Sequence, residues 1–138
     1  MTNPTPPRGT MTTLRALPRA LLVDLSPTES DTVTKLLLQE KYLPFRASGA
    51  DDAIKKLKAD RHEFVLVNVE MGAPGAAAFI EALRADEQLS GLPVLVTSAT
   101  DDIEGIERCL ERGADDYLPK ALGLAVLKAR VSAALDRR

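Results

Sequence analysis

The chain has 138 residues, of which 45% are hydrophobic and 28% are charged, and its formal net charge at pH 7 is −2. This length and composition are typical of one globular domain with its own hydrophobic core. A slightly acidic chain lacks the clustered basic face that nucleic-acid binding requires, so we expect no nucleic-acid partner. A single cysteine, Cys109, and no apolar run of the roughly 20 residues that span a bilayer favour a cytoplasmic protein without membrane association.

The start of the chain differs in composition from the rest. Met1–Thr13 is rich in threonine and proline and shows no hydrophobic period, which indicates a disordered leader. We therefore expect a leader over residues 1–15 and one domain over residues 16–138.

Short apolar runs recur after this leader. Residues 20–23, 64–67 and 94–97 form unbroken runs rich in β-branched side chains, as strands buried on both faces of a sheet do. Weaker strands are expected near residues 44–47 and 115–118. Between the runs lie segments of helix length with apolar residues three or four positions apart. Five such repeats predict an α/β fold, a doubly wound (βα)5 sandwich whose five-stranded parallel sheet carries helices on both faces.

Local signals mark two helix starts. Ser26, Pro27 and Glu29 indicate an N-cap, a proline at the first helical position and a capping-box glutamate. Asp101 is expected to cap a later helix that ends at Gly113.

The polar residues that follow the strands are candidates for function, because ligands of doubly wound sheets bind at the carboxyl ends of the strands. These residues are Asp24, Asn68, Ser98 and Lys120. No glycine-rich phosphate loop follows the first strand, which argues against dinucleotide binding.

Three segments carry a family resemblance. They are Leu21-Leu22-Val23-Asp24 with the following Ser26-Pro27, the pair Ser98-Ala99, and the segment GADDYLPK at residues 113–120. From Arg19 to Arg138 the chain resembles the receiver domains of bacterial two-component response regulators. The resemblance implies the flavodoxin-like strand order 2-1-3-4-5 and a role in phosphorelay signal transduction.

The same resemblance implies a site in which two adjacent acids hold Mg²⁺, an aspartate accepts a phosphoryl group, and a hydroxyl and a lysine contact it. Asp24, Ser98 and Lys120 match this pattern, but Leu25 replaces the second acid and Asn68 replaces the acceptor. Leucine offers no oxygen to a hard cation, and an amide cannot form an acyl phosphate. We therefore expect a degenerate pocket with no catalytic residue, no metal site, weak or absent Mg²⁺ binding and no enzymatic activity.

Other residues near this pocket have more than one interpretation. Glu70 is a solvated loop residue, a substitute acid, or a residue that supplies a metal oxygen together with Asp24. Lys120 is expected to pair with Asp24, and its bond to Ala121, where the family has proline, is expected to be trans. Asn68 is interpreted as a polar plug.

The resemblance also implies a switch and partner surface, for which the candidates are Tyr117, Ile106, Leu110, Leu124 and Val131. Cys109 is expected in the core, and His62 is expected to have no metal or catalytic role. The leading hypothesis is a phosphorylation-independent module that binds a histidine kinase, an output domain or another regulator, or that forms a homodimer. The alternatives are an active phosphoacceptor that uses Glu70, and a sensor that binds a small ligand in the vacated crevice.

Overall fold

The structure, a computed structural model, describes residues 17–118 and 124–137, so the expected leader and Lys120 lie outside the described residues. The strands are β1 (Arg19–Val23), β2 (Leu43–Ala47), β3 (Phe64–Asn68), β4 (Val94–Thr97) and β5 (Asp116–Leu118). The helices are α2 (Pro27–Gln39), α3 (Ala50–Ala59), α4 (Ala76–Ala85), α5 (Ile103–Glu111) and α6 (Leu124–Arg137). Within the described part of the chain, none of these helices is long and apolar enough to cross a membrane.

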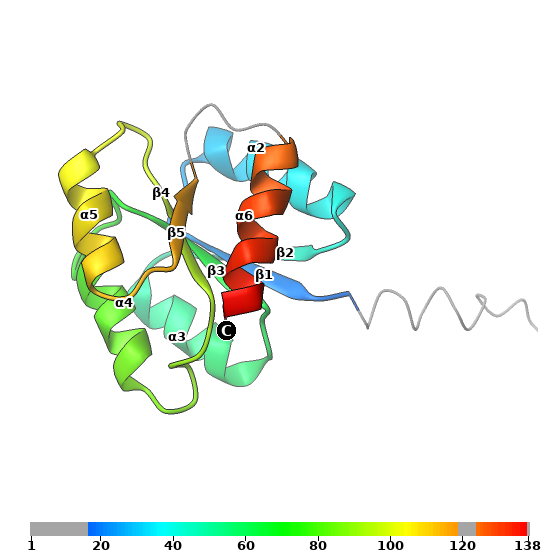
Figure 1. Ribbon diagram of the computed structural model, residues 1–138. Coiled ribbons are helices and arrows are strands. Elements are labelled where there is room, and N and C mark those ends of the chain that lie inside the picture. Colours follow the sequence, from blue (N-terminus) through cyan, green and yellow to red (C-terminus); the bar gives the residue numbers. More distant parts are fainter. Residues whose placement is uncertain (1–16, 119–123, 138) are drawn as a thin grey trace, which may run out of the picture.

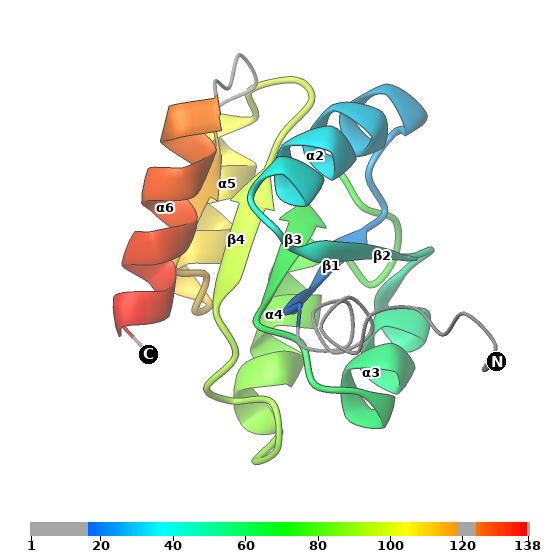
Figure 2. The ribbon, with the colours of Figure 1, turned by 90° about the vertical axis from the view of Figure 1, so that its right-hand side faces the viewer.

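The five strands form one parallel sheet in the order β2-β1-β3-β4-β5, which confirms the predicted fold class. Helices α2 and α6 cover one face of this sheet, and α3, α4 and α5 cover the other (Figures 1 and 2). A parallel sheet covered on both faces needs apolar side chains on both faces, which explains the unbroken apolar runs.

Successive strand residues point to opposite faces of the sheet and so build two cores. The core under α3, α4 and α5 contains Leu21, Val23, Val65, Val67, Val94 and Val96. The core under α2 and α6 contains Ala20, Leu22, Phe64, Leu66 and Leu95. Cys109 of α5 belongs to the first core and is buried, as expected, and this burial raises the pKa of its thiol.

The helix starts confirm one capping prediction and correct another. The Ser26 hydroxyl accepts a hydrogen bond from the Glu29 backbone N–H at 3.3 Å, as predicted. The prediction for Asp101 was wrong, because Asp102 is the N-cap of α5 and its carboxylate accepts from the Gly105 N–H at 3.0 Å. Asp101 instead has a positive φ of 54° and carries the turn that leads into the cap.

Candidate functional site

The carboxyl ends of three adjacent strands bring the candidate residues to one edge of the sheet. Val23 pairs with Val67, and Asn68 pairs with Thr97, so Asp24, Asn68 and Ser98 follow one another across β1, β3 and β4. This grouping is the one expected from the sequence, whereas the pairing of Lys120 with Asp24 lies outside the described residues.

Asn68 uses both ends of its buried amide to hold backbone groups. Its Nδ2 donates to the backbone carbonyl of Asp24 at 2.9 Å, and its Oδ1 accepts from the Glu70 N–H at 3.2 Å. A carboxylate at this position has acceptors only, and one oxygen would face the Asp24 carbonyl oxygen without a proton between them. The side chain therefore acts as a strut between β1 and the loop after β3, which fits the interpretation of a polar plug.

Asp24 is held in the left-handed region, with φ of 56°, and its N–H donates to the Ala47 carbonyl at 3.0 Å. Its carboxylate accepts from the Gly72 N–H at 3.2 Å. The next residue, Leu25, is partly buried against the core under α2 and α6 instead of offering an oxygen. Among residues 17–118 and 124–137, no three His, Cys, Asp or Glu side chains are grouped so that they could hold a metal ion.

Glu70 lies in the loop after β3 and binds the loop after β4. The buried Ser98 hydroxyl donates to Glu70 Oε2 at 2.6 Å, and the Ala99 N–H donates to Oε1 at 2.7 Å. Glu70 is exposed, as the solvated interpretation expected, but these two hydrogen bonds hold its carboxylate in place. Its interpretations as a substitute acid and as a metal ligand together with Asp24 stay predictions. Residue type and spacing gave no signal for this contact, because it joins two loops 28 residues apart in the chain.

A hollow beside Asp24, between α2 and α3, is the place where a small ligand would have to bind under the sensor hypothesis. The Lys56 ammonium in this hollow already contacts the Asp52 carboxylate at 3.1 Å and the Arg46 carbonyl at 2.6 Å. Hydrogen bonds from the Ser48 backbone and from Lys56 lower the pKa of Asp52. The lining comprises Leu22, Asp24, Leu25, Pro27, Ser30, Arg46, Ala47, Ser48, Asp52 and Lys56. The opposite charges in the hollow balance, so it offers no net charge to a ligand.

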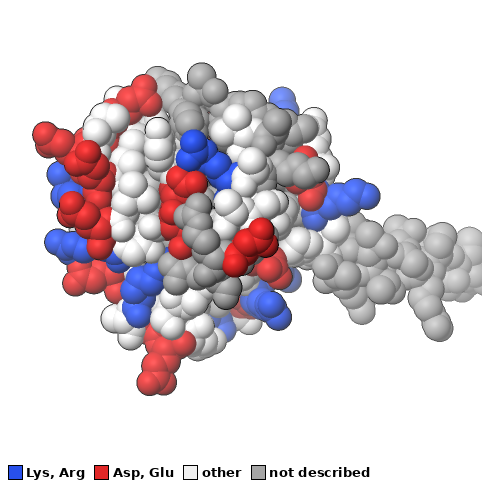
Figure 3. Space-filling view, in the orientation of Figure 1, with Lys and Arg blue, Asp and Glu red and all other residues white. Residues whose placement is uncertain are grey.

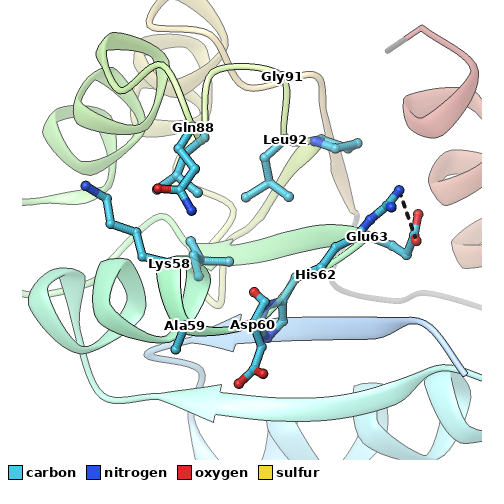
Figure 4. Close-up of a pocket in the computed structure, with 12 residues that line it drawn as sticks. Lys58, Ala59, Asp60, His62, Glu63, Gln88, Gly91 and Leu92 are labelled. Carbon is cyan, nitrogen blue, oxygen red and sulfur yellow. Dashed lines mark hydrogen bonds and ion pairs between the residues drawn. The ribbon is translucent and has the colours of Figure 1, made fainter. Parts of the chain in front are cut away.

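A second hollow lies at the opposite, amino-terminal edge of the sheet, between the end of α3 and the loop before β4 (Figure 4). Lys58 there pairs with Asp86 at 2.7 Å, and Arg61 pairs with Glu63 at 3.9 Å. Burial lowers the pKa of His62, whose Nδ1 lies 3.0 Å from the Asp60 carbonyl. The charged side chains of these ion pairs are thus bound to one another. Doubly wound sheets bind ligands at the carboxyl-terminal edge of the sheet, not at this amino-terminal edge.

The predicted partner surface is only partly exposed. Ile106 was placed on it wrongly, since its side chain is 6% exposed and packs in the core. Leu110 is 38% exposed, and Ile103, for which the sequence pattern gave no signal, is 61% exposed. Figure 3 shows an uncharged strip between the charged outer side of α5 and β5.

Tyr117 lies on the edge strand β5 and is half-buried. The Arg130 guanidinium lies 5.3 Å from the centre of its ring and forms an ion pair with Asp116 at 2.8 Å. The side chains of Leu124 and Val131, also placed on the surface, are outside the described part of α6.

This fold, with polar side chains gathered at the carboxyl ends of β1, β3 and β4, defines a receiver domain. The family model of the response regulator receiver domain matches residues 20–132, and the chain belongs to this family, whose members are the receiver modules of two-component systems. The chain is 34% identical over 124 residues to the transcriptional regulatory protein PrrA of Mycobacterium tuberculosis, covering 88% of the chain and 51% of PrrA. It is 28% identical over 119 residues to the phosphate regulon transcriptional regulatory protein PhoB of Escherichia coli, covering 86% and 52%. The chain thus spans about half the length of these relatives.

Solved structures share the fold. A putative response regulator from Chloroflexus aurantiacus superposes with a TM-score of 0.80 at 24% identity, over 86% of this chain and 98% of that one. The receiver domain of the sensor histidine kinase PA1611 from Pseudomonas aeruginosa gives a TM-score of 0.78 at 21% identity, over 88% and 99%. That second structure is described with a magnesium ion coordinated in its active-site cleft.

Proposed function

We propose that this receiver domain signals without accepting phosphate and acts through protein–protein contacts. The observation that carries the proposal is the amide of Asn68, which stands at the end of β3 and donates to the Asp24 carbonyl at 2.9 Å. Phosphoryl transfer to a receiver needs a carboxylate that attacks phosphorus, and a neutral amide is a far poorer nucleophile that cannot form the acyl phosphate.

The neighbouring residues support the same conclusion. Mg²⁺ prefers carboxylate oxygens, and the position after Asp24 holds Leu25, whose side chain packs on apolar neighbours. The Asn68 oxygen that faces this edge already accepts the Glu70 N–H. These donors do not fit Mg²⁺, so we propose a domain with no resident cofactor and no catalytic activity of its own.

The partner surface proposed for this domain is the side of α5 that faces β5, including Ile103, Leu110 and Tyr117. Exposed aliphatic and aromatic side chains next to a charged rim are typical of protein-binding surfaces. The proposed partner is a histidine kinase, an output domain or another regulator, or a second copy of the chain. PrrA and PhoB are named as transcriptional regulators and are about twice as long as the region aligned with this chain. An output domain is therefore the partner we favour.

The test is the intact mass of the protein after incubation with Mg²⁺ and acetyl phosphate. Three proteins are compared: the wild type, the variant Leu25→Asp, and the double variant Leu25→Asp, Asn68→Asp. We expect the wild type and Leu25→Asp to stay unmodified and the double variant to gain one phosphoryl group. Leu25→Asp is the matched control, because it restores the second acid without restoring an acceptor.

A phosphoryl group on the wild type would overturn the proposal. Its position would then be found by repeating the reaction with Glu70→Gln, since Glu70 is the nearest alternative acid in the loop after β3. Loss of the label in that variant would establish Glu70 as a substitute acceptor.

A further inference from the structure

The carboxylate of Glu70 is bound at both oxygens by groups of another loop. Oε2 accepts the Ser98 hydroxyl proton at 2.6 Å, and Oε1 accepts the Ala99 N–H at 2.7 Å. Hydrogen bonds to an ionised acceptor are shorter and stronger than those between neutral groups. The Ser98 hydroxyl and the Ala99 N–H thus bind the two oxygens of one anion and form an oxyanion site. The anion in this site is the Glu70 side chain.

Ser98 also binds backbone groups of the loop between β4 and α5. Its side chain is buried. The hydroxyl donates a hydrogen bond to Glu70, and the same oxygen accepts hydrogen bonds from the N–H groups of Thr100 at 3.3 Å and Asp102 at 3.0 Å. With Ala99 bound directly to Glu70, three amides of the segment between β4 and α5 depend on this one arrangement. Asp102 is also the N-cap of α5, so the arrangement fixes where α5 begins.

The residue before Glu70 also contacts α5. Gly105 lies in the first turn of α5, and a Cβ atom there would come within 2.6 Å of Val69 Cγ1 and 2.5 Å of Asp102 Oδ2. The segment Val69–Glu70 therefore packs closely on α5 while Glu70 holds the loop that precedes it. Val69 and Glu70 thus join the end of β3 both to the loop that precedes α5 and to the first turn of α5.

We propose that Glu70 is a permanent internal ligand of the Ser98–Ala99 oxyanion site and that it holds the loop 99–102 and the start of α5 in the anion-bound arrangement. The inference rests on the proposed function, because a built-in anion can replace an external phosphoryl group only in a receiver that accepts none. Glu70 is then a positioning residue for the partner surface on α5, which includes the exposed Ile103. The domain presents this surface continuously, without a phosphorylation step.

The experiment measures backbone amide hydrogen exchange by NMR in the wild type, Glu70→Gln and Glu70→Ala. Glu107→Gln is the matched control, because it removes the same charge from an exposed position on α5 itself. Glu70→Ala removes both acceptors, so exchange of Ala99, Thr100 and Asp102 is expected to speed up by about tenfold or more in this variant. Glu70→Gln keeps one neutral acceptor oxygen, so a smaller increase is expected there. The central strands and the Glu107→Gln control are expected to exchange as the wild type does.

A second arm separates an oxyanion site from an ordinary loop contact. Inorganic phosphate is added to Glu70→Ala, with sodium chloride at equal ionic strength as the control. Phosphate is expected to slow the exchange of Ala99 again in Glu70→Ala and to change nothing in the wild type, where Glu70 fills the site. Chloride is expected to have no effect in either protein.

Unchanged exchange of Ala99, Thr100 and Asp102 in both Glu70 variants would overturn the inference, and so would faster exchange that phosphate does not reverse. Neither readout involves covalent phosphorylation. A wild-type protein that gains a phosphoryl group would therefore contradict the proposed function. The hydrogen-exchange result would still test whether Glu70 holds the loop before α5.

Discussion

The side-chain amide of Asn68 and the backbone carbonyl of Asp24 join the carboxyl ends of β3 and β1 through a 2.9 Å hydrogen bond. Asn68 is 9% exposed, so this donor has little access to water. The bond exists because an amide carries a proton that a carboxylate lacks. Asn68, on which the proposed loss of phosphorylation rests, therefore also makes a contact at the same edge that an aspartate could not make.

The first prediction concerns Asn68→Asp. The carboxylate would face the Asp24 carbonyl oxygen, so we expect the free energy of unfolding at neutral pH to fall by about 1–3 kcal/mol. Urea unfolding followed by circular dichroism measures this loss.

Gln88→Glu is the control for Asn68→Asp, since it makes the same chemical change at an exposed position. Its effect is expected to stay within about 0.5 kcal/mol. An Asn68→Asp protein as stable as the wild type would mean that the bond to Asp24 contributes nothing.

The second prediction concerns Arg84, whose guanidinium joins the end of α4 to the segments before β4 and β5. It donates to the carbonyls of Ser90, Leu92 and Gly113 at 2.6–2.9 Å and to the Asp115 carboxylate at 3.2 Å. The Arg84 and Asp115 side chains are 16% and 6% exposed. Arg84→Met removes the arginine partner of a buried carboxylate and the donor to three backbone carbonyls, so it is expected to cost about 3–5 kcal/mol.

Arg112→Met provides the comparison for Arg84→Met, because Arg112 pairs with Glu81 at the surface, where both side chains are at least half exposed. Surface ion pairs contribute about 1 kcal/mol or less. Equal losses in the two variants, measured by urea unfolding, would contradict the structural role assigned to Arg84.

Most of the fold follows from the sequence because its central strands are buried on both faces. The apolar runs at residues 20–23, 64–67 and 94–97 coincide with β1, β3 and β4 to within one residue. Strand β2 gave a weaker signal because it lies at the sheet edge, where Phe45 and Arg46 are exposed. Strand β5, at the other edge, has three residues.

The parts that sequence reasoning missed depend on contacts between distant segments. Asp101 and Asp102 are equally good caps by residue type, and the bond from the Asp102 N–H to Ser98 decides between them. For the same reason, the partner of Glu70 was not predictable, because two loops must first be brought together by the sheet. Strand ends, in contrast, place Asp24, Asn68 and Ser98 at one edge by topology alone.

The third prediction compares two isoleucines of α5 that are three positions apart. Ile106 is 6% exposed and lies in the core, whereas Ile103 is 61% exposed. Ile106→Ala is expected to lower the free energy of unfolding by about 2–5 kcal/mol, and Ile103→Ala by about 0.5 kcal/mol or less. Urea unfolding of both variants checks this, and a large loss for Ile103→Ala would show that its side chain is covered in solution.

The fourth prediction is a pH dependence from His62. Burial lowers the pKa of this imidazole in the folded protein, while the unfolded chain keeps the ordinary value of about 6.5. Below that pH the unfolded state binds a proton that the folded state does not, so stability falls as pH decreases from about 6.5 toward the folded pKa. We expect His62→Gln to flatten this part of the curve of unfolding free energy against pH. An equally steep fall in His62→Gln would assign the dependence to other groups.

The last prediction concerns competition between the Glu70 carboxylate and a phosphoryl group on residue 68 for the same hydrogen-bond donors. In the double variant Leu25→Asp, Asn68→Asp, a phosphoryl group formed on residue 68 must share the Ser98 hydroxyl and the Ala99 N–H with Glu70, which already holds both. Two anions that compete for the same donors weaken each other, because each loses its hydrogen bonds when the other is bound. Adding Glu70→Gln to the double variant is therefore expected to raise the fraction of protein that acetyl phosphate phosphorylates in a fixed time. Recovery of one hydrogen bond to the ionised phosphoryl group corresponds to an increase of about tenfold at low conversion.

Intact mass measures that fraction, and Glu107→Gln added to the double variant controls for the change in net charge. If the two triple variants are phosphorylated equally, Glu70 does not compete with phosphate for these donors.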